Sequence, residues 1–173
     1  MTRFTAALAL FLVPATAFAL NPGDKATPFR LEDSKGTPYT LKSFGEPVLV
    51  VWYEGKNSKE QNRWIKDKLK ELRDAGKLTD KKYRSLGIAN FQETAVPNAI
   101  IAMVIRSEIK KTGALILCDR DGGMMKKWGF RNGRSNIYVF DKDRNLVWKT
   151  SGPLDKRRGM QLIKLIQRLH RQS

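Results

Sequence analysis

The order of strands and helices predicted from the sequence indicates an α/β fold, a three-layer sandwich with helices on both faces of a mixed central sheet. Continuous runs of β-branched, aromatic and aliphatic residues at 47–53 and 114–118 are typical of strands buried on both faces. Segments with helical apolar spacing follow these runs, and such alternation is typical of a sheet covered by helices. Two further runs, at 137–141 and 146–149, flank a short polar turn and predict an antiparallel hairpin.

Each helix is predicted from its local pattern. Residues 58–61, Ser-Lys-Glu-Gln, match a capping box, so a helix is expected to begin at Ser58 and to stop near Gly76. Pro97 suits the opening of a second helix, because the first helical N–H has no partner to lose. The predicted elements are strands at 29–31 and 39–41, a strand at 47–53, a helix at 58–76, a strand at 83–90, a helix at 97–111, a strand at 114–118, a short helix at 124–128, the hairpin at 137–141 and 146–149, and a helix at 154–171.

The first nineteen residues have the organisation of a secretory signal peptide. Arg3 provides the positive start, residues 4–13 are apolar, and Ala17-Phe18-Ala19 reads as a cleavage site. The apolar run is about half the ~20 residues needed to cross a bilayer, and no later segment is long and apolar enough to span one. We therefore expect residues 1–19 to be removed and residues 20–173 to form one domain in the periplasm.

The chain is strongly basic, with 33 Lys and Arg against 17 Asp and Glu and a formal net charge of +16. Such a charge favours anionic partners, for example lipid headgroups or acidic polymers. Hydrophobic residues make up 41% of the chain and charged residues 29%, a globular composition. Cys118 is the single cysteine, so no internal disulfide can form and the fold must be held by its core.

The sequence resembles the thioredoxin fold in its peroxiredoxin and cytochrome-maturation-like form. The leader PGDKATPFRLED at 22–33 is similar to the "G-x-x-A-P-x-F-x-L-x-D" opening of those families. Gly129-Phe130, followed by residues 137–141, is similar to their "G-V … P-T-x-F-L-I-D-x-D-G" segment. The order and spacing of these motifs cover nearly all of the expected mature chain, and the resemblance implies the thioredoxin-like version of the three-layer sandwich.

Within that superfamily, the chain resembles the YtfJ-like family of exported proteins. The resemblance implies a periplasmic, thioredoxin-like protein and provides no catalytic residues to carry over. It rests on Gly55, Ser58, Lys59, Glu60 and Asn62 after the central strand, on Val104, Arg106 and Ser107, and on Val139, Asp141, Lys142, Asp143, Trp148, Gly152 and Leu154.

Both halves of the thioredoxin redox site are absent from the sequence. The C-x-x-C motif of that fold lies where the central strand meets the next helix, because the helix N-terminus stabilises a thiolate and the second cysteine resolves the mixed disulfide. Asn57 and Glu60 stand at about these two positions, and neither can exchange thiols. Ser135 stands where the fold usually has a cis-proline, so we expect a trans bond there. The sequence therefore predicts a degenerate redox site.

We expect this degenerate site to serve as a binding surface. The candidate residues are Gly55, Lys56, Asn57, Ser58, Lys59, Glu60, Arg134 and Ser135. Cys118 lies in an apolar strand, which favours a buried core residue, and the alternative is a redox thiol.

Other candidate groups favour structural roles. Ser58 is expected to cap a helix rather than to act as a nucleophile, because His170, the only histidine, is placed on the last helix. The acidic segments at 119–121 and 141–145 resemble the start of a calcium loop, but the second has Leu146 where the loop needs glycine and Gly152 where it needs a bidentate glutamate. Both are expected to be turns, and no metal and no cofactor is expected. The basic amphipathic helix at 154–171 is expected to pack its apolar face on the core rather than on an anionic membrane.

These observations favour a non-catalytic binding or scaffold protein of the cell envelope, with an unidentified envelope protein or an anionic ligand as partner. Two alternatives stay open. One is a peroxiredoxin-like thiol antioxidant enzyme acting through Cys118, and the other is an electrostatic binder of anionic lipid or polymer. Nucleic acid is disfavoured as a partner by the expected export, although Trp52 and Tyr53 near a lysine-rich loop resemble a stacking platform.

Overall fold

The computed structural model describes residues 19–173, so the predicted signal segment, apart from Ala19, lies outside the described part of the chain. Leu20, the expected first residue of the mature chain, is buried in the core, and its carbonyl accepts a hydrogen bond of 2.8 Å from Lys149 Nζ. Among residues 19–173, no helix has both the length and the apolar character needed to cross a membrane.

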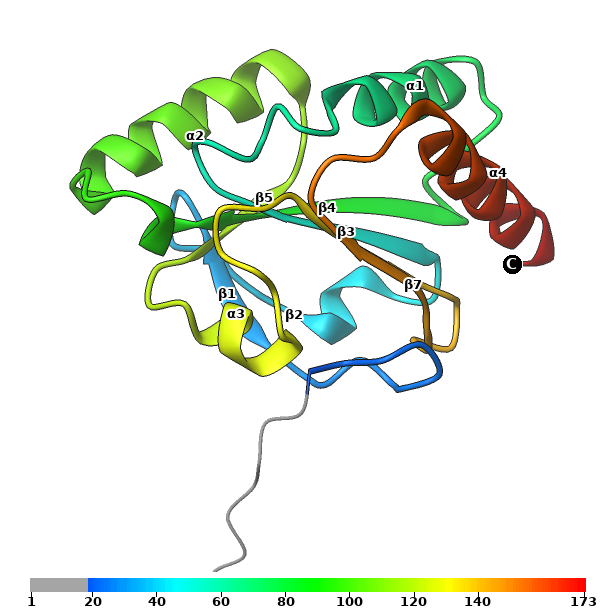
Figure 1. The fold of residues 1–173 in the computed structure, drawn as a ribbon, viewed down its shortest axis with the longest axis horizontal. Coiled ribbons are helices and arrows are strands. Elements are labelled where there is room, and N and C mark those ends of the chain that lie inside the picture. Colours follow the sequence, from blue (N-terminus) through cyan, green and yellow to red (C-terminus); the bar gives the residue numbers. More distant parts are fainter. Residues whose placement is uncertain (1–18) are drawn as a thin grey trace, which may run out of the picture.

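One sheet of seven strands in the order β2-β1-β5-β4-β3-β6-β7 organises the fold (Figure 1). β3, β4 and β5 are parallel, and the hairpins at both edges are antiparallel. The sheet is therefore mixed, as the sequence predicts. The strands are β1 (Arg30–Asp33), β2 (Pro38–Thr40), β3 (Val48–Glu54), β4 (Tyr83–Asn90), β5 (Ile116–Asp119), β6 (Asn136–Phe140) and β7 (Leu146–Ser151).

Helices cover both faces of this sheet. Figure 1 shows α1, α2 and α4 on one face and the short α3 on the other. The three-layer α/β prediction is therefore confirmed. The helices are α1 (Arg63–Asp74), α2 (Asn98–Thr112), α3 (Gly123–Trp128) and α4 (Lys156–Gln172), with 3₁₀ turns at η1 (Leu41–Phe44) and η2 (Phe91–Glu93).

β3 contributes to two hydrophobic cores because successive side chains of a strand point to opposite faces. Leu49, Val51 and Tyr53 pack on the α3 face together with Trp128. The alternate residues Val48, Val50 and Trp52 pack on the face covered by α1 and α4. This double burial explains why the strand reads as an unbroken apolar run.

α4 lies against α1 on the second core. Leu162, Ile163 and Ile166 are buried, which confirms the prediction that the apolar side of this helix packs on the core. The two helices approach closely at Gly159, where an added Cβ would lie 2.3 Å from a ring atom of Trp64. A glycine at this position is therefore required by packing.

The prediction that α1 begins at Ser58 is wrong. Residues 56–62 form turns, and the helix begins at Arg63. The physical reason is that the Ser58 hydroxyl has other partners: its Oγ accepts a hydrogen bond from Gly55 N at 2.9 Å and donates one to Glu93 at 3.1 Å. The capping-box pattern is present in the sequence, but a tertiary contact uses its serine.

Trp128 is fully buried at the centre of an aromatic cluster with Phe29, Phe130 and Phe140, and its Nε1 donates to Thr27 Oγ1 at 2.9 Å. We predict that Trp128→Ala lowers the free energy of unfolding by about 3–5 kcal/mol, because a large cavity replaces the ring. Urea denaturation followed by circular dichroism measures this loss.

Lys126→Ala is the matched control, since Lys126 lies on the same helix with an exposed side chain. Its unfolding midpoint is expected to stay close to that of the unchanged protein. Equal loss in both variants would contradict the packing role of Trp128.

Candidate binding site at the degenerate redox position

The candidate site lies at the carboxyl end of β3, where open α/β sheets commonly bind ligands. The loop 55–62 leads from β3 to α1, and the loop 131–135 faces it before β6. Gln61 and Ser135 join the two loops, because Ser135 N donates a hydrogen bond of 3.0 Å to Gln61 Oε1. The structure therefore brings together the two segments that the sequence singled out.

A buried carboxylate, Glu54, lies beneath both loops. Only 11% of its side chain is exposed. It forms an ion pair of 2.6 Å with Lys66 and accepts a hydrogen bond of 2.6 Å from Ser135 Oγ. Burial raises the pKa of the Glu54 carboxyl, and the Lys66 ammonium and the Ser135 hydroxyl oppose this rise.

Asn62 is the second buried polar group that holds the loops together. Its Nδ2 donates to Ser135 Oγ and to the Gly152 carbonyl, both at 3.0 Å. Its Oδ1 accepts from Leu154 N at 2.9 Å. The side chain thus connects the start of α1 with the segments before β6 and before α4. All these polar atoms have partners, so the network is rigid rather than a source of unsatisfied groups.

Ser58 is fully buried and organises the turn that follows β3. The Ser58 hydroxyl contacts Gly55 and Glu93, as described above. The neighbouring Asn57 N donates a hydrogen bond of 3.1 Å to Glu93 Oε1. An added Cβ at Gly55 would lie 1.7 Å from Glu93 Oε2. Glycine is therefore needed at position 55 so that the carboxylate from η2 can approach the backbone.

The predicted surface residues divide into an exposed set and a buried set. Ser58 and Ser135 are buried beneath the loops, whereas Lys56, Asn57, Glu60 and Arg134 are exposed, and Gly55 and Lys59 are half-buried. Arg63 binds the Glu60 carboxylate, and this bond lowers the pKa of Glu60. The exposed part of the site therefore presents mixed charge with an excess of cations.

The peptide bond at Ser135 is trans, as expected, and residues 19–173 contain no cis peptide bond. His170 does not reach the site. Its Nε2 accepts a hydrogen bond of 3.0 Å from Thr79 N. The structure therefore does not bring Ser58 and His170 together.

Cys118 is buried between β5 and α2, where it packs with Phe91 and Ile105. The interpretation as a buried core residue is confirmed. Burial raises the pKa of its thiol. In the sheet, Cys118 pairs with Ala89 and Ala89 pairs with Glu54, so one strand separates the thiol from the buried carboxylate.

Sequence reasoning missed the groups that hold the site together, Glu54, Lys66 and Glu93 among them. Asp119 was also missed as a buried carboxylate. Its Oδ2 accepts a hydrogen bond of 2.8 Å from the Tyr53 hydroxyl, and burial raises the pKa of both groups. The one signal in the sequence for these carboxylates was the position of Glu54 and Asp119, each at the end of an apolar strand run. Trp52 and Tyr53 are both buried, so they offer no stacking platform.

Comparison with solved structures identifies the fold as thioredoxin-like. The chain superposes on a structure titled as a putative thiol:disulfide interchange protein DsbE from Chlorobium tepidum, with a TM-score of 0.65 and 13% identity over 88% of this chain and 99% of that chain. A hypothetical protein from Sinorhizobium meliloti 1021 gives a TM-score of 0.63 and 20% identity over 87% and 86%. A thiol peroxidase from Chromobacterium violaceum gives 0.63 and 15% over 87% and 88%.

The sequence matches no protein-family model and no curated protein at a significant level. The structure is that of a thioredoxin-like domain, and its loop between β3 and α1 contains Asn57 and Glu60 and no cysteine. The likeness to the solved structures concerns the fold alone.

Asn62→Ala tests the buried network. The substitution leaves Leu154 N and the Gly152 carbonyl without their partner, and each unsatisfied buried group costs about 1–3 kcal/mol. We predict a loss of about 2–4 kcal/mol in the free energy of unfolding, measured by chemical denaturation. Asn57→Ala is the control, because the Asn57 side chain is exposed and only the backbone N–H of this residue forms a hydrogen bond, to Glu93. A neutral Asn62→Ala variant would refute the network's role.

Proposed function

We propose that this chain is an exported periplasmic protein, related to the YtfJ-like proteins, that binds another envelope component through its degenerate redox position. The N-terminal sequence pattern supports export. Mass spectrometry of the protein from its host is expected to find a start near Leu20.

The observation that carries the binding proposal is the hydrogen-bonded frame beneath the two loops. Glu54, Asn62 and Ser135 hold the loops from below with satisfied polar contacts. A surface fixed in this way loses little conformational entropy when a partner binds. No cysteine is present at this position to perform thiol exchange, so the loops are free to serve recognition.

A photo-crosslinking amino acid placed at Asn57 tests the proposal in the intact cell envelope. Asn57 is exposed in the centre of the loop, and its backbone contact with Glu93 does not depend on its side chain. We expect a discrete protein adduct from this position. The matched control places the same group at Asp143, which is exposed in the turn between β6 and β7. Identical adducts from both positions, or no adduct from Asn57, would overturn the proposal.

The rival function is a thiol antioxidant enzyme that acts through Cys118. Its chemistry needs an accessible thiolate, whereas burial raises the Cys118 pKa and α2 covers the thiol. We predict that a thiol reagent labels native protein roughly tenfold or more slowly than protein unfolded in urea. Because the pKa is raised, native labelling is expected to stay slow as the pH rises through the range in which an exposed thiol ionises.

Ser43→Cys in a Cys118→Ala background provides the control, since Ser43 is exposed. This thiol is expected to label rapidly in the native state. Cys118→Ala by itself is expected to lower stability by only about 1 kcal/mol. Rapid native labelling of Cys118, with peroxide consumption that Cys118→Ser abolishes, would support the antioxidant enzyme instead.

A further inference from the structure

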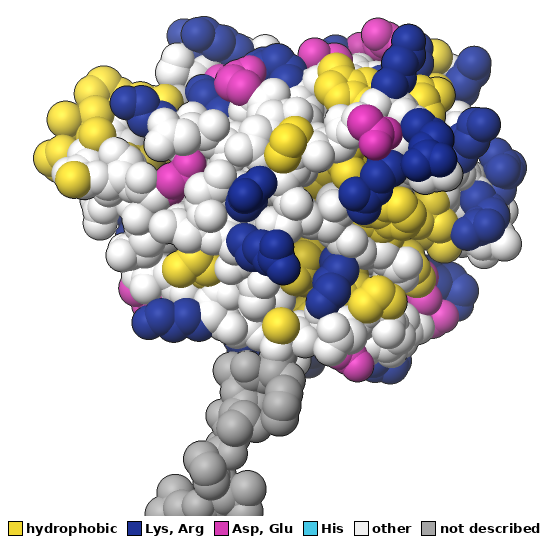
Figure 2. Space-filling model, in the orientation of Figure 1, with side chains coloured by type: hydrophobic (Ala, Val, Ile, Leu, Met, Phe, Trp, Pro, Cys, Tyr) yellow, Lys and Arg dark blue, Asp and Glu magenta, His cyan; other side chains and the backbone are white. Residues whose placement is uncertain are grey.

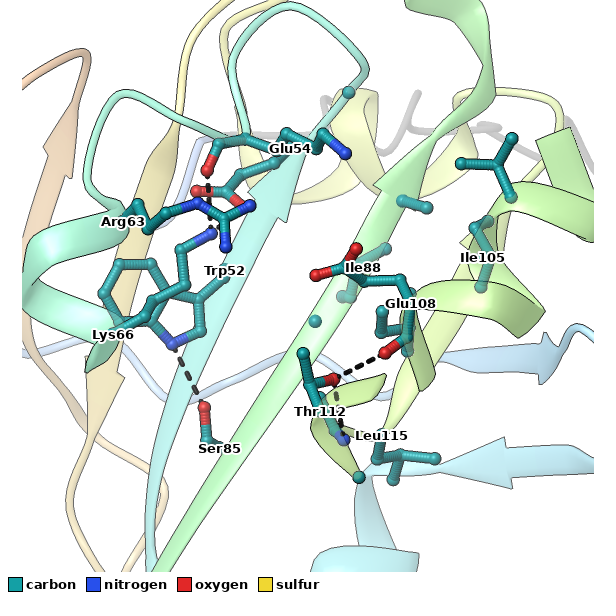
Figure 3. A pocket seen from close by; sticks show the side chains of 18 of the residues that line it. Trp52, Glu54, Arg63, Lys66, Ser85, Ile88, Ile105, Glu108, Thr112 and Leu115 are labelled. Carbon is teal, nitrogen blue, oxygen red and sulfur yellow. Dashed lines mark hydrogen bonds and ion pairs between the residues drawn. The ribbon is translucent and has the colours of Figure 1, made fainter. Parts of the chain in front are cut away.

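The face of β4 that the helices are expected to cover is open. β4 lies between β3 and β5 in the sheet, yet Ser85 is exposed and Gly87 and Ala89 are only half-buried. These three residues lie on the same face as Trp52, whose Nε1 donates to Ser85 Oγ at 3.2 Å. A cavity of about 850 Å³ lies above them, between α1 and α2. Figure 3 shows Trp52 and Lys66 on one side of it and Ile105 and Glu108 on the other.

Small side chains make the floor of this groove. Gly87 has no side chain, and an added Cβ there would meet an Ile116 side-chain atom at 3.2 Å. The groove follows the whole of β4, since both Tyr83 and Asn90 contribute to it. A strand of this length, Tyr83–Asn90, extends about 26 Å.

α1 supplies a cationic wall. Lysines and arginines recur at intervals of four, three, four and three residues from the loop through the helix, which places them on one face. Their acidic neighbours Glu60, Asp74 and Asp80 have side chains 55–63% exposed, so these ion pairs are weak and exchangeable. The basic residues that line the groove from this side are Lys59, Arg63, Lys66, Lys70 and Arg73. Glu54, Asp67 and Asp80 also line it, and Glu54 pairs with Lys66, so the wall keeps a net excess of cations.

α2 supplies a mainly apolar wall that also carries the Glu108 carboxylate. Ile101 and Ile105 line the groove, and Ile100 and Val104 line it with 47% and 54% of their surface exposed. Within residues 19–173, the large hydrophobic residues with high exposure are Ile100, Met103 and Val104, all on this helix. Figure 2 shows a cluster of hydrophobic side chains at the end of the molecule where Figure 1 places α2. Contiguous exposed apolar patches commonly occur at interaction sites.

We propose that the groove between α1 and α2 is the docking site for an acidic amphipathic helix of a partner protein. The apolar face of that helix packs on α2 and the floor, and its carboxylates face the cations of α1. A helix of about 17 residues has the length of the groove. The proposal rests on the function proposed above, because Gly55, Lys56 and Lys59 belong to both the loop site and the groove.

Charge distribution distinguishes this occupant from others. The cations extend along the whole of α1, so they match a ligand whose negative charges repeat along its length. An anionic lipid carries its charge at one end only. A second copy of this chain brings the same cationic wall and a net charge of +16, which opposes self-association.

The test uses a fluorescein-labelled synthetic 17-residue peptide of leucine and glutamate, patterned as an amphipathic helix, and fluorescence anisotropy with the purified protein. We expect saturable binding that weakens about fivefold or more in Lys70→Glu and in Val104→Asp. Matched controls are Lys68→Glu and Met103→Asp, which lie on the same helices with side chains about half exposed but outside the groove. Their affinities are expected to stay within about twofold of the unchanged protein.

Four results would overturn the proposal. Two concern the peptide: a scrambled peptide of the same composition, or a peptide with lysine in place of glutamate, binds as tightly as the designed peptide. The third is a loss of affinity in the control variants as large as in Lys70→Glu and Val104→Asp. The fourth is a concentration-dependent dimer, seen by sedimentation, that Val104→Asp abolishes. Denaturation midpoints of all four variants verify that they are folded. If Lys70→Glu and Val104→Asp leave the crosslinked adduct from position Asn57 unchanged, the groove is rejected as the docking site and the loop site is kept. Peptide binding in the groove without capture from Asn57 would reject the loop site alone.

Discussion

A carboxylate buried at the end of the central strand is the constraint on which the arrangement of the site depends. An isolated charge in the interior is very costly, so Glu54 must be paired and hydrogen-bonded. Lys66 from α1 supplies the charge and Ser135 supplies the hydrogen bond. Those two requirements fix the position of α1 relative to β3 and draw the loop before β6 over the strand end. Asn62 completes the frame by joining the same elements to the start of α4.

The rest of the sheet supports this frame by burying β3 on both faces. The aromatic cluster around Trp128 fills one side, and the contacts of α1 with α4 fill the other. A rigid strand end therefore carries the loop that bears Asn57, and Glu93 fixes the same loop from η2. The buried Ser58 hydroxyl and the Asn57 backbone hold this loop, whereas the Asn57 side chain is exposed.

The open face of β4 has its own physical cause. Ser85, Gly87 and Ala89 offer little side-chain surface for α1 and α2 to pack on in the middle of β4. α1 instead packs against α4, and α2 packs against η2 and β5. The groove between them joins the loop site at Gly55 and Lys59. A helix with an excess of cations and a mainly apolar helix therefore face each other across the open face of β4, beside the loop 55–62.

The sequence by itself determined the α/β class, the strand runs, the hairpins and the absence of a cysteine pair, because these follow from local periodicity and from residue identity. It also located Cys118 in an apolar strand. Only the tertiary structure decided where α1 begins, because a carboxylate 35 residues away, that of Glu93, takes the Ser58 hydroxyl. The same holds for the bond between Glu54 and Ser135, which are 81 residues apart, and for the separation of α1 and α2. Contacts between distant segments depend on packing, and no local pattern in the sequence encodes them.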